Sequence, residues 1–189
     1  DRLVFEYFEL SVVLHLEMLL ALKSFVIYYI NIYKLIVKSS MRTKKLYQGI
    51  FKPKNPSKYT GDVNNIIYRS GWEHKFMQYL DSHQDILEWS SEELAIPYLS
   101  PVDNRYHRYF PDFIVKKRNK EGLIETLIIE IKPKSQTKEP AVKNKITKQY
   151  LHEVFQWGTN QAKWKACEQY CTKRGFRFCI LTEHELGIK

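Results

Sequence analysis

The amino-acid sequence predicts an α/β fold in which helices flank one central mixed sheet. Apolar residues recur at helical spacing in two segments, residues 62–83 and residues 143–173. Short strand-like apolar runs lie between these segments, and one more follows the second of them. The predicted order is therefore helix, three or four strands, helix and strand, which is typical of an α/β sandwich.

Turn and capping residues mark the ends of the predicted elements. Asp62 is expected to cap the first helix, which runs to His83. Gly175 follows the second helix, where a C-terminal glycine is common. Thr182 and Glu185 have the spacing of a capping box before a short terminal helix. The predicted strands are short apolar runs bounded by turn residues: 86–89, 94–99, 106–116, 123–132 and 176–181.

The chain divides by composition into three parts. Residues 1–40 lack Gly, Pro and Cys and are mostly apolar after residue 19. We interpret them as upstream sequence translated in frame, because Met41 is a plausible natural start; an amphipathic or membrane-anchoring helix is the alternative. Residues 41–61 are basic and contain two prolines, which predicts an extended N-terminal arm. Residues 62–189 form the third part, and they contain the candidate site.

The charge of the chain favours a polyanionic partner. Lys and Arg number 30 against 21 Asp and Glu, a net charge of +9. Residues 1–40 are balanced, so the whole surplus lies on residues 41–189. Each phosphate neutralised by a cationic side chain releases a counterion, which favours nucleic acid as the partner, although solubility alone is the simpler explanation. Three cysteines cannot pair completely and suit a reducing compartment.

Two short motifs carry the candidate chemistry. Pro111 and Asp112 lie in the run RYFPDFIV, and Glu130 and Lys132 close the run LIIEIK. Side chains alternate along a strand, so Glu130 and Lys132 share one face. If Asp112 lies on the neighbouring strand, its carboxylate meets that of Glu130, and the two repel unless a cation lies between them. Mg²⁺ suits such a site, where it would polarise a phosphodiester and activate a bound water.

Each motif alone is a weak signal. A glutamate and a lysine two positions apart on a strand usually form a solvated salt bridge. The two motifs together are more specific, because they lie on successive predicted strands, separated by a glycine turn, in a basic chain. Their combination predicts a hydrolytic site for phosphate esters.

The two motifs together resemble the signature of the PD-(D/E)xK nuclease superfamily, whose core is restriction-endonuclease-like, with an αβββαβ order and a central mixed sheet. From Tyr47 to Leu186 the chain more specifically resembles the head completion nucleases of large tailed phages. The segments that carry this resemblance include FKPKNPSKYTGD, NIIYRSGWEHKFMQYLD, IEIKPK and NQAKWKA. Similar architecture occurs in the endonuclease subunit of some cut-and-paste transposition systems.

This resemblance implies a metal-dependent DNA endonuclease. It makes Asp112 and Glu130 metal-binding acids and Lys132 the catalytic lysine. It also makes Glu73 a metal-binding and catalytic residue that the first helix turns toward the metal, whereas the residues alone allow an exposed helix glutamate. Mg²⁺ is the implied cofactor and Mn²⁺ is expected to substitute for it; no small-molecule cofactor is implied.

The resemblance also implies a biological setting. Such proteins act after DNA packaging, where they process or protect the DNA end before the tail attaches. The implied partners are double-stranded DNA and proteins of the phage head, portal or neck, with no membrane, in the virion or in the cytoplasm of the infected bacterium. A non-catalytic, DNA-binding structural component of the head or neck is the main alternative. A restriction- or transposition-type endonuclease is a further one, which the lack of a visible recognition domain disfavours.

Further polar residues are weaker candidates for DNA contacts. They either flank the two motifs or lie on the second helix: His107, Arg108, Lys134, Lys138, Lys143, Lys145, Gln161 and Lys163. Cys167 and Cys171 could bind zinc together with His152 or His184. No CxxC pair is present, so small buried cysteines are the favoured interpretation.

Overall fold

The computed structural model describes residues 47–187. Within this range, residues 47–145 and 153–187 belong to one compact unit. The interpretation of residues 1–40 lies outside the described residues. The helices are α2 (Gly71–Ser82) and α3 (Lys148–Thr172), with short 3₁₀ helices η1 (Pro56–Lys58) and η2 (Lys134–Gln136). The strands are β1 (Gly49–Ile50), β2 (Ile67–Tyr68), β3 (Ile86–Ser91), β4 (Ile96–Leu99), β5 (Tyr106–Tyr109), β6 (Phe113–Arg118), β7 (Ile124–Ile131) and β8 (Arg177–Leu181).

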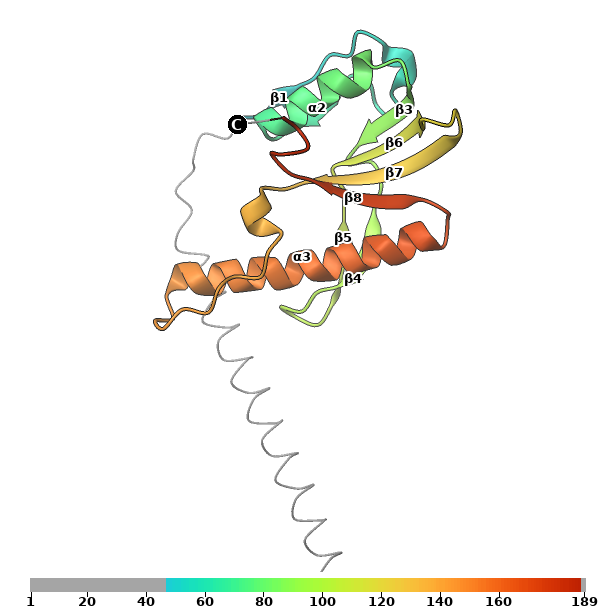
Figure 1. The fold of residues 1–189 in the computed structure, drawn as a ribbon. Helices are drawn as coiled ribbons and strands as arrows, with labels where there is room; N and C mark the ends of the chain where they lie inside the picture. Colours follow the sequence, from blue (N-terminus) through green and yellow to red (C-terminus); the bar gives the residue numbers. More distant parts are fainter. Residues whose placement is uncertain (1–46, 188–189) are drawn as a thin grey trace, which may run out of the picture. The chain divides into compact units, whose positions relative to one another are not determined.

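The central sheet is mixed, as the sequence predicts. Its strand order is β3-β6-β7-β8. β6 is antiparallel to both β3 and β7, and β8 joins β7 in parallel after the crossover through α3. Figure 1 shows α2 on one side of this sheet and α3 on the other. The fold is therefore a mixed α/β sandwich.

Each face of the central sheet has its own hydrophobic core. Toward α2, Phe113 and Ile129 pack with Phe76 and Met77 of the helix. Toward α3, Ile128 packs with Trp164, Cys167 and the β4–β5 hairpin. Alternation along β6 and β7 explains the division, because neighbouring residues of one strand point to opposite faces. The sheet is apolar on both faces, so a charged side chain on it needs a specific partner.

The first helix begins later than its sequence pattern predicts. Asp62 does not cap it; this residue instead closes a turn, with its carboxylate accepting the backbone N–H of Asn64 at 3.0 Å. The helix starts at Gly71, after Ser70, whose hydroxyl accepts the backbone N–H of Glu73 at 3.1 Å. Ile67 and Tyr68 lie between these two positions and form β2, which pairs with β1. Their apolar side chains therefore belong to a strand and not to the face of a helix.

The described part of the basic arm contains β1 and η1, and it belongs to the main core. Phe51 and Tyr59 are buried against Trp89. Asp81, near the end of α2, accepts the backbone N–H groups of Lys54 and Asn55 at 2.8 and 3.0 Å. The core of the domain therefore begins before residue 62.

The strand predicted at residues 106–116 is two strands in the structure. Tyr106–Tyr109 pairs with β4, whereas Phe113–Arg118 joins the central sheet. Pro111 lies at the break, and its ring nitrogen has no hydrogen to donate to a ladder. The chain thus changes sheets immediately before Asp112.

The C-terminal half follows the prediction more closely. Gly175 follows α3 with a φ of +68°, a left-handed conformation that glycine adopts without strain. Thr182 and Glu185 form the predicted capping contacts, with the threonine N–H donating to the carboxylate at 2.7 Å. Turns rather than a helix follow them. Within residues 47–187, no helix is both long and apolar enough to cross a membrane.

Candidate active site

The register of β6 and β7 brings Asp112 and Glu130 to the same face of the sheet. Phe113 pairs with Ile129, so the next opposed positions along the antiparallel strands are Asp112 and Glu130. Phe113 and Ile129 are buried toward α2. Alternation therefore directs the two acids to the other face, which α3 covers.

Glu130 is a buried carboxylate with a partner on each oxygen. The residue is 4% exposed. Its Oε1 lies 2.9 Å from Nζ of Lys132, and its Oε2 accepts a hydrogen bond of 2.6 Å from the hydroxyl of Tyr109. A buried carboxylate is costly without such compensation. Lys132 supplies the charged partner and Tyr109 the neutral one.

Asp112 is held beside Glu130 by the backbone of β7. Its Oδ2 accepts the N–H of Ile131 at 2.7 Å. Burial, followed by the charge of Glu130, raises the pKa of Asp112 to about 8, although Lys132 and the Ile131 N–H both act in the opposite direction. This environment favours a protonated Asp112, and a cation would be needed to keep both acids ionised at neutral pH.

Two lysines lie within reach of these charges. Burial lowers the pKa of Lys132, but the charges of Glu130 and Asp112 outweigh this effect and the net shift is upward, so its ammonium is retained. Lys163 comes from α3, and burial lowers its pKa, partly offset by the charge of Glu130. The Nζ of Lys163 lies 5.6 Å from the ring centroid of Tyr109 and 5.7 Å from that of Tyr98.

The chemistry of this donor set fits a hard divalent cation. When Asp112 and Glu130 are both ionised, Lys132 balances only one of the two negative charges, and carboxylate oxygens are the ligands that Mg²⁺ takes from proteins. Among residues 47–187, no three His, Cys, Asp or Glu side chains gather into a metal-binding group. The described chain thus offers a pair of carboxylates, which suits an ion that keeps several waters.

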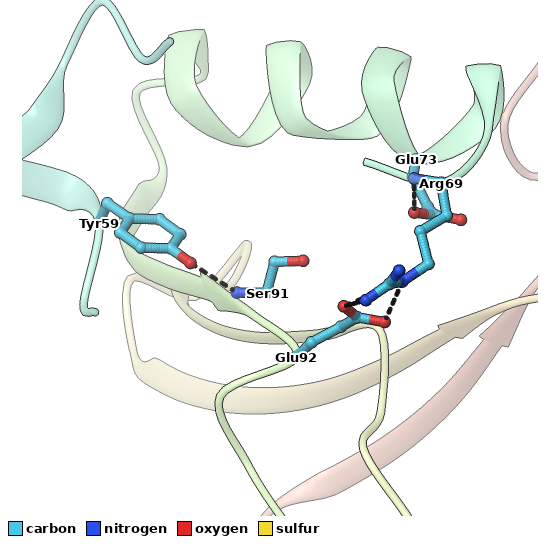
Figure 2. Close-up of polar contacts among 5 residues, drawn as sticks. All are labelled: Tyr59, Arg69, Glu73, Ser91 and Glu92. Atoms are coloured by element: carbon cyan, nitrogen blue, oxygen red, sulfur yellow. Dashed lines mark hydrogen bonds and ion pairs between the residues drawn. The ribbon is translucent and has the colours of Figure 1, made fainter. Parts of the chain in front are cut away.

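Glu73 acts as a helix cap in this structure. Its two carboxylate oxygens accept the Ser70 hydroxyl at 2.8 Å and the backbone N–H of Arg69 at 2.7 Å. Ser70 in turn accepts the N–H of Glu73, which completes a variant of the capping box, because the Glu73 carboxylate accepts the N–H of Arg69 and not that of the N-cap Ser70. Figure 2 shows the carboxylate turned back toward the chain that enters α2. Its charge has only a minor raising effect on the pKa of Asp112, and it does not join a three-carboxylate group among the described residues.

The remaining predicted DNA contacts do not form one cluster with the acids. His107 lies 2.9 Å from a carboxylate oxygen of Asp103, and the guanidinium of Arg108 lies 5.6 Å from the ring centroid of Phe110. Lys143 pairs with Glu153 at 2.8 Å. Lys163, on α3, is partly buried. The other four residues are exposed on the loop after β7 or on α3: Lys134, Lys138, Lys145 and Gln161.

The predicted zinc alternative is not supported. Cys167 and Cys171 are buried free thiols in the core between α3 and the sheet. Burial raises the pKa of Cys167, which disfavours the thiolate that zinc binding requires. The interpretation as small buried cysteines is confirmed.

The sequence alone did not identify two features next to the acids. Tyr109 is on β5, a strand outside the central sheet, and only the folding of the hairpin under α3 brings it to Glu130. Arg69 forms a two-pronged ion pair with Glu92, at 2.9 and 2.7 Å (Figure 2). The backbone N–H of Glu92 donates to the carbonyl of Asp112 at 3.2 Å. No spacing in the sequence indicates either contact.

Two comparisons with known proteins identify relatives of this chain. Residues 83–183 match the family described as TnsA-like endonuclease N terminal. The chain is similar to a protein of Enterobacteria phage T4 named head completion nuclease, with 40% identity over 150 residues, which cover 76% of this chain and 97% of that protein. No solved structure matches the chain.

Proposed function

The chain belongs to the TnsA-like endonuclease family and is a homologue of the T4 head completion nuclease, and from this premise we propose that it is a metal-dependent endonuclease that hydrolyses phosphodiester bonds of double-stranded DNA. The observation that carries the proposal is the pair of acids on one face of the sheet, the half-buried Asp112 and the buried Glu130, with Lys132 2.9 Å from Glu130. The same motifs support a PD-(D/E)xK core for the α/β sandwich.

The residues of the site divide the chemistry between them. Asp112 and Glu130 hold the divalent ion, and the Ile131 N–H keeps Asp112 in position. When bound, the metal polarises the phosphodiester and lowers the pKa of a coordinated water. Lys132 keeps its proton beside the acids, so its ammonium orients the attacking water and balances charge that develops on the phosphate. Mg²⁺ is the proposed ion, with Mn²⁺ as a substitute.

The name of the T4 relative supports a role in head completion. In this role the protein processes or protects the packaged DNA end before the tail attaches, in contact with head, portal or neck proteins, in the virion or the infected cell. The exposed basic residues on the loop after β7 provide the DNA-facing surface, and the surplus of +9 supports a polyanionic substrate. Glu73 becomes a third metal ligand in this proposal when it leaves its capping box.

A supercoiled-plasmid assay with the full chain tests the activity. The wild-type protein should nick or linearise the plasmid with Mg²⁺ and not with a chelator. Glu130→Gln should abolish cleavage, because it removes the ligand charge while keeping the side-chain shape. Glu125→Gln is the matched control: Glu125 is on the same strand and also pairs with a lysine, Lys117, at 3.4 Å. Its cleavage should equal that of the wild type.

The main rival is a structural head component that binds DNA without cutting it. Cleavage by Glu130→Gln at the wild-type rate would mean that the site is elsewhere. Retained DNA binding, with no cleavage by the wild type under any metal condition, would favour the structural role over the nuclease.

A further inference from the structure

Tyr109 makes a buried contact that links a second sheet to the candidate site. It is the last residue of β5, which pairs with β4 and not with the central sheet. The residue is 3% exposed, and its hydroxyl donates to Oε2 of Glu130 at 2.6 Å. The two residues are 21 positions apart. Glu130 is therefore oriented from outside its own sheet.

The contact leaves little freedom to the carboxylate. Lys132 holds one oxygen of Glu130 at 2.9 Å, and Tyr109 holds the other. Without the hydroxyl, Lys132 alone would fix the group, and the carboxylate could rotate about a single contact. A ligand that must be ordered on binding loses affinity, because ordering its side chain costs entropy.

The ring of Tyr109 is itself held in place. It packs in the same core as Trp164, Cys167 and Tyr98. The ammonium of Lys163 lies near both tyrosine rings, at 5.6 and 5.7 Å. A hydroxyl on a fixed ring has a fixed position, so the donor arrives at Glu130 already oriented.

We propose that Tyr109 is a positioning residue that orients Glu130 for binding of the divalent cation. This inference rests on the proposed function, since it assigns Tyr109 a role through a proposed metal ligand. Tyr109 is not a catalytic residue: it acts through Glu130. The role requires the hydroxyl and not the ring alone.

Tyr98 is a matched control for the hydroxyl. It is on the paired strand β4, it is buried to a similar degree, and it shares Lys163 and the same core. Within the described part of the chain, Glu130 is contacted by the hydroxyl of Tyr109 and not by that of Tyr98. Tyr98→Phe and Tyr109→Phe therefore remove the same atom from the same core, and only the second removes the contact with Glu130.

Titration of the full chain with Mn²⁺, followed by electron paramagnetic resonance, tests the proposal. Tyr109→Phe should weaken Mn²⁺ binding roughly 10- to 100-fold, the usual effect of removing a hydrogen bond to a metal ligand. Tyr98→Phe should bind Mn²⁺ as the wild type does. Plasmid cleavage by Tyr109→Phe should recover at high Mn²⁺ concentration, because the defect is in metal affinity. Thermal unfolding of both variants checks that each is folded.

Three outcomes would overturn the inference in different ways. Equal Mn²⁺ affinity of Tyr109→Phe and wild type would show that the hydroxyl does not orient Glu130. Equal weakening by Tyr98→Phe and Tyr109→Phe would assign the effect to packing of the core. Absence of Mn²⁺ binding by the wild type would contradict the proposed metal site itself. This failure of the proposed function is distinguishable from failure of the inference about Tyr109, because it is seen in the wild type alone.

Discussion

Replacing Asp112 by asparagine should stabilise the metal-free protein while abolishing cleavage. The asparagine amide keeps an oxygen that can accept the N–H of Ile131, the contact that Asp112 makes at 2.7 Å. It carries no charge, so it removes the repulsion from Glu130 and the burial cost of a second carboxylate. Active-site residues of this kind commonly trade stability for activity.

The size of this gain in stability and its dependence on pH follow from the raised pKa of Asp112. Burial and the charge of Glu130 raise this pKa from 3.8 to about 8. A carboxyl with a higher pKa in the folded state binds its proton more tightly there, so its stabilising effect is present below pH 4 and is lost between about pH 4 and pH 8. A tenfold change in proton affinity corresponds to about 1.4 kcal/mol, which gives an upper value of about 5 kcal/mol at pH 8. Relaxation and water entry reduce such penalties, so we expect a gain of about 2–3 kcal/mol.

Urea unfolding of both proteins in chelator, at pH 5 and pH 8, measures this gain. Asp112→Asn should be more stable at pH 8, and the difference should shrink at pH 5. Mg²⁺ should stabilise the wild type more than the variant, since only the wild type has both ligands. Asp103→Asn is a control at a carboxyl whose pKa is shifted in the opposite direction. The hydrogen bond with His107 lowers the pKa of Asp103, so this variant should not gain stability. Equal stability of wild type and Asp112→Asn at pH 8 would refute the assignment of Asp112 as a buried, repelled carboxylate.

Three further predictions concern the fold around the site. Ser70→Ala should destabilise the protein by about 1 kcal/mol, because it removes the cap of α2 at the Glu73 N–H, and thermal unfolding measures this. Ile128→Ala should cost about 2–5 kcal/mol in urea unfolding, since Ile128 is fully buried under α3, whereas Ile124→Ala on the exposed end of the same strand should cost far less. Arg69→Gln should cost about 0.2–1 kcal/mol, because its ion pair with Glu92 is more than half exposed on the arginine side, and the loss should diminish in high salt.

The features predictable from the sequence are those that depend on strand alternation and on local turn chemistry. The resemblance to head completion nucleases is confirmed by the T4 relative. The strands of the sheet and the glycine turn after α3 follow the sequence pattern, because hydrophobic periodicity and a glycine in the left-handed region are local properties. The shared face of Asp112 and Glu130 follows from alternation once the two strands are neighbours.

The differences between the predicted and the observed elements have equally specific causes. Asp62 and Ser70 both precede apolar residues at helical spacing, and the choice between them depends on the pairing of Ile67 and Tyr68 with β1, a contact distant in sequence. The break at Pro111 separates two strands of similar composition that join different sheets. Tyr109 is next to His107 and Arg108 in the sequence, yet it alone reaches Glu130, because alternation and the position of the hairpin decide which side chain is buried. Such contacts depend on tertiary structure and leave no local signal.

The capping box of α2 bears directly on the proposed role of Glu73. As a metal ligand, its carboxylate would have to release the Ser70 hydroxyl and the Arg69 N–H, which it now holds at 2.8 and 2.7 Å. Release of these two hydrogen bonds costs about 1 kcal/mol each, and a direct contact between the carboxylate and a divalent cation would offset this cost. The helix N-terminus would also keep Ser70 as a cap, since its contact with the Glu73 N–H is independent of the carboxylate. Capping by Glu73 and ligation by Glu73 would therefore be energetically compatible, and arrival of the ion would decide between them.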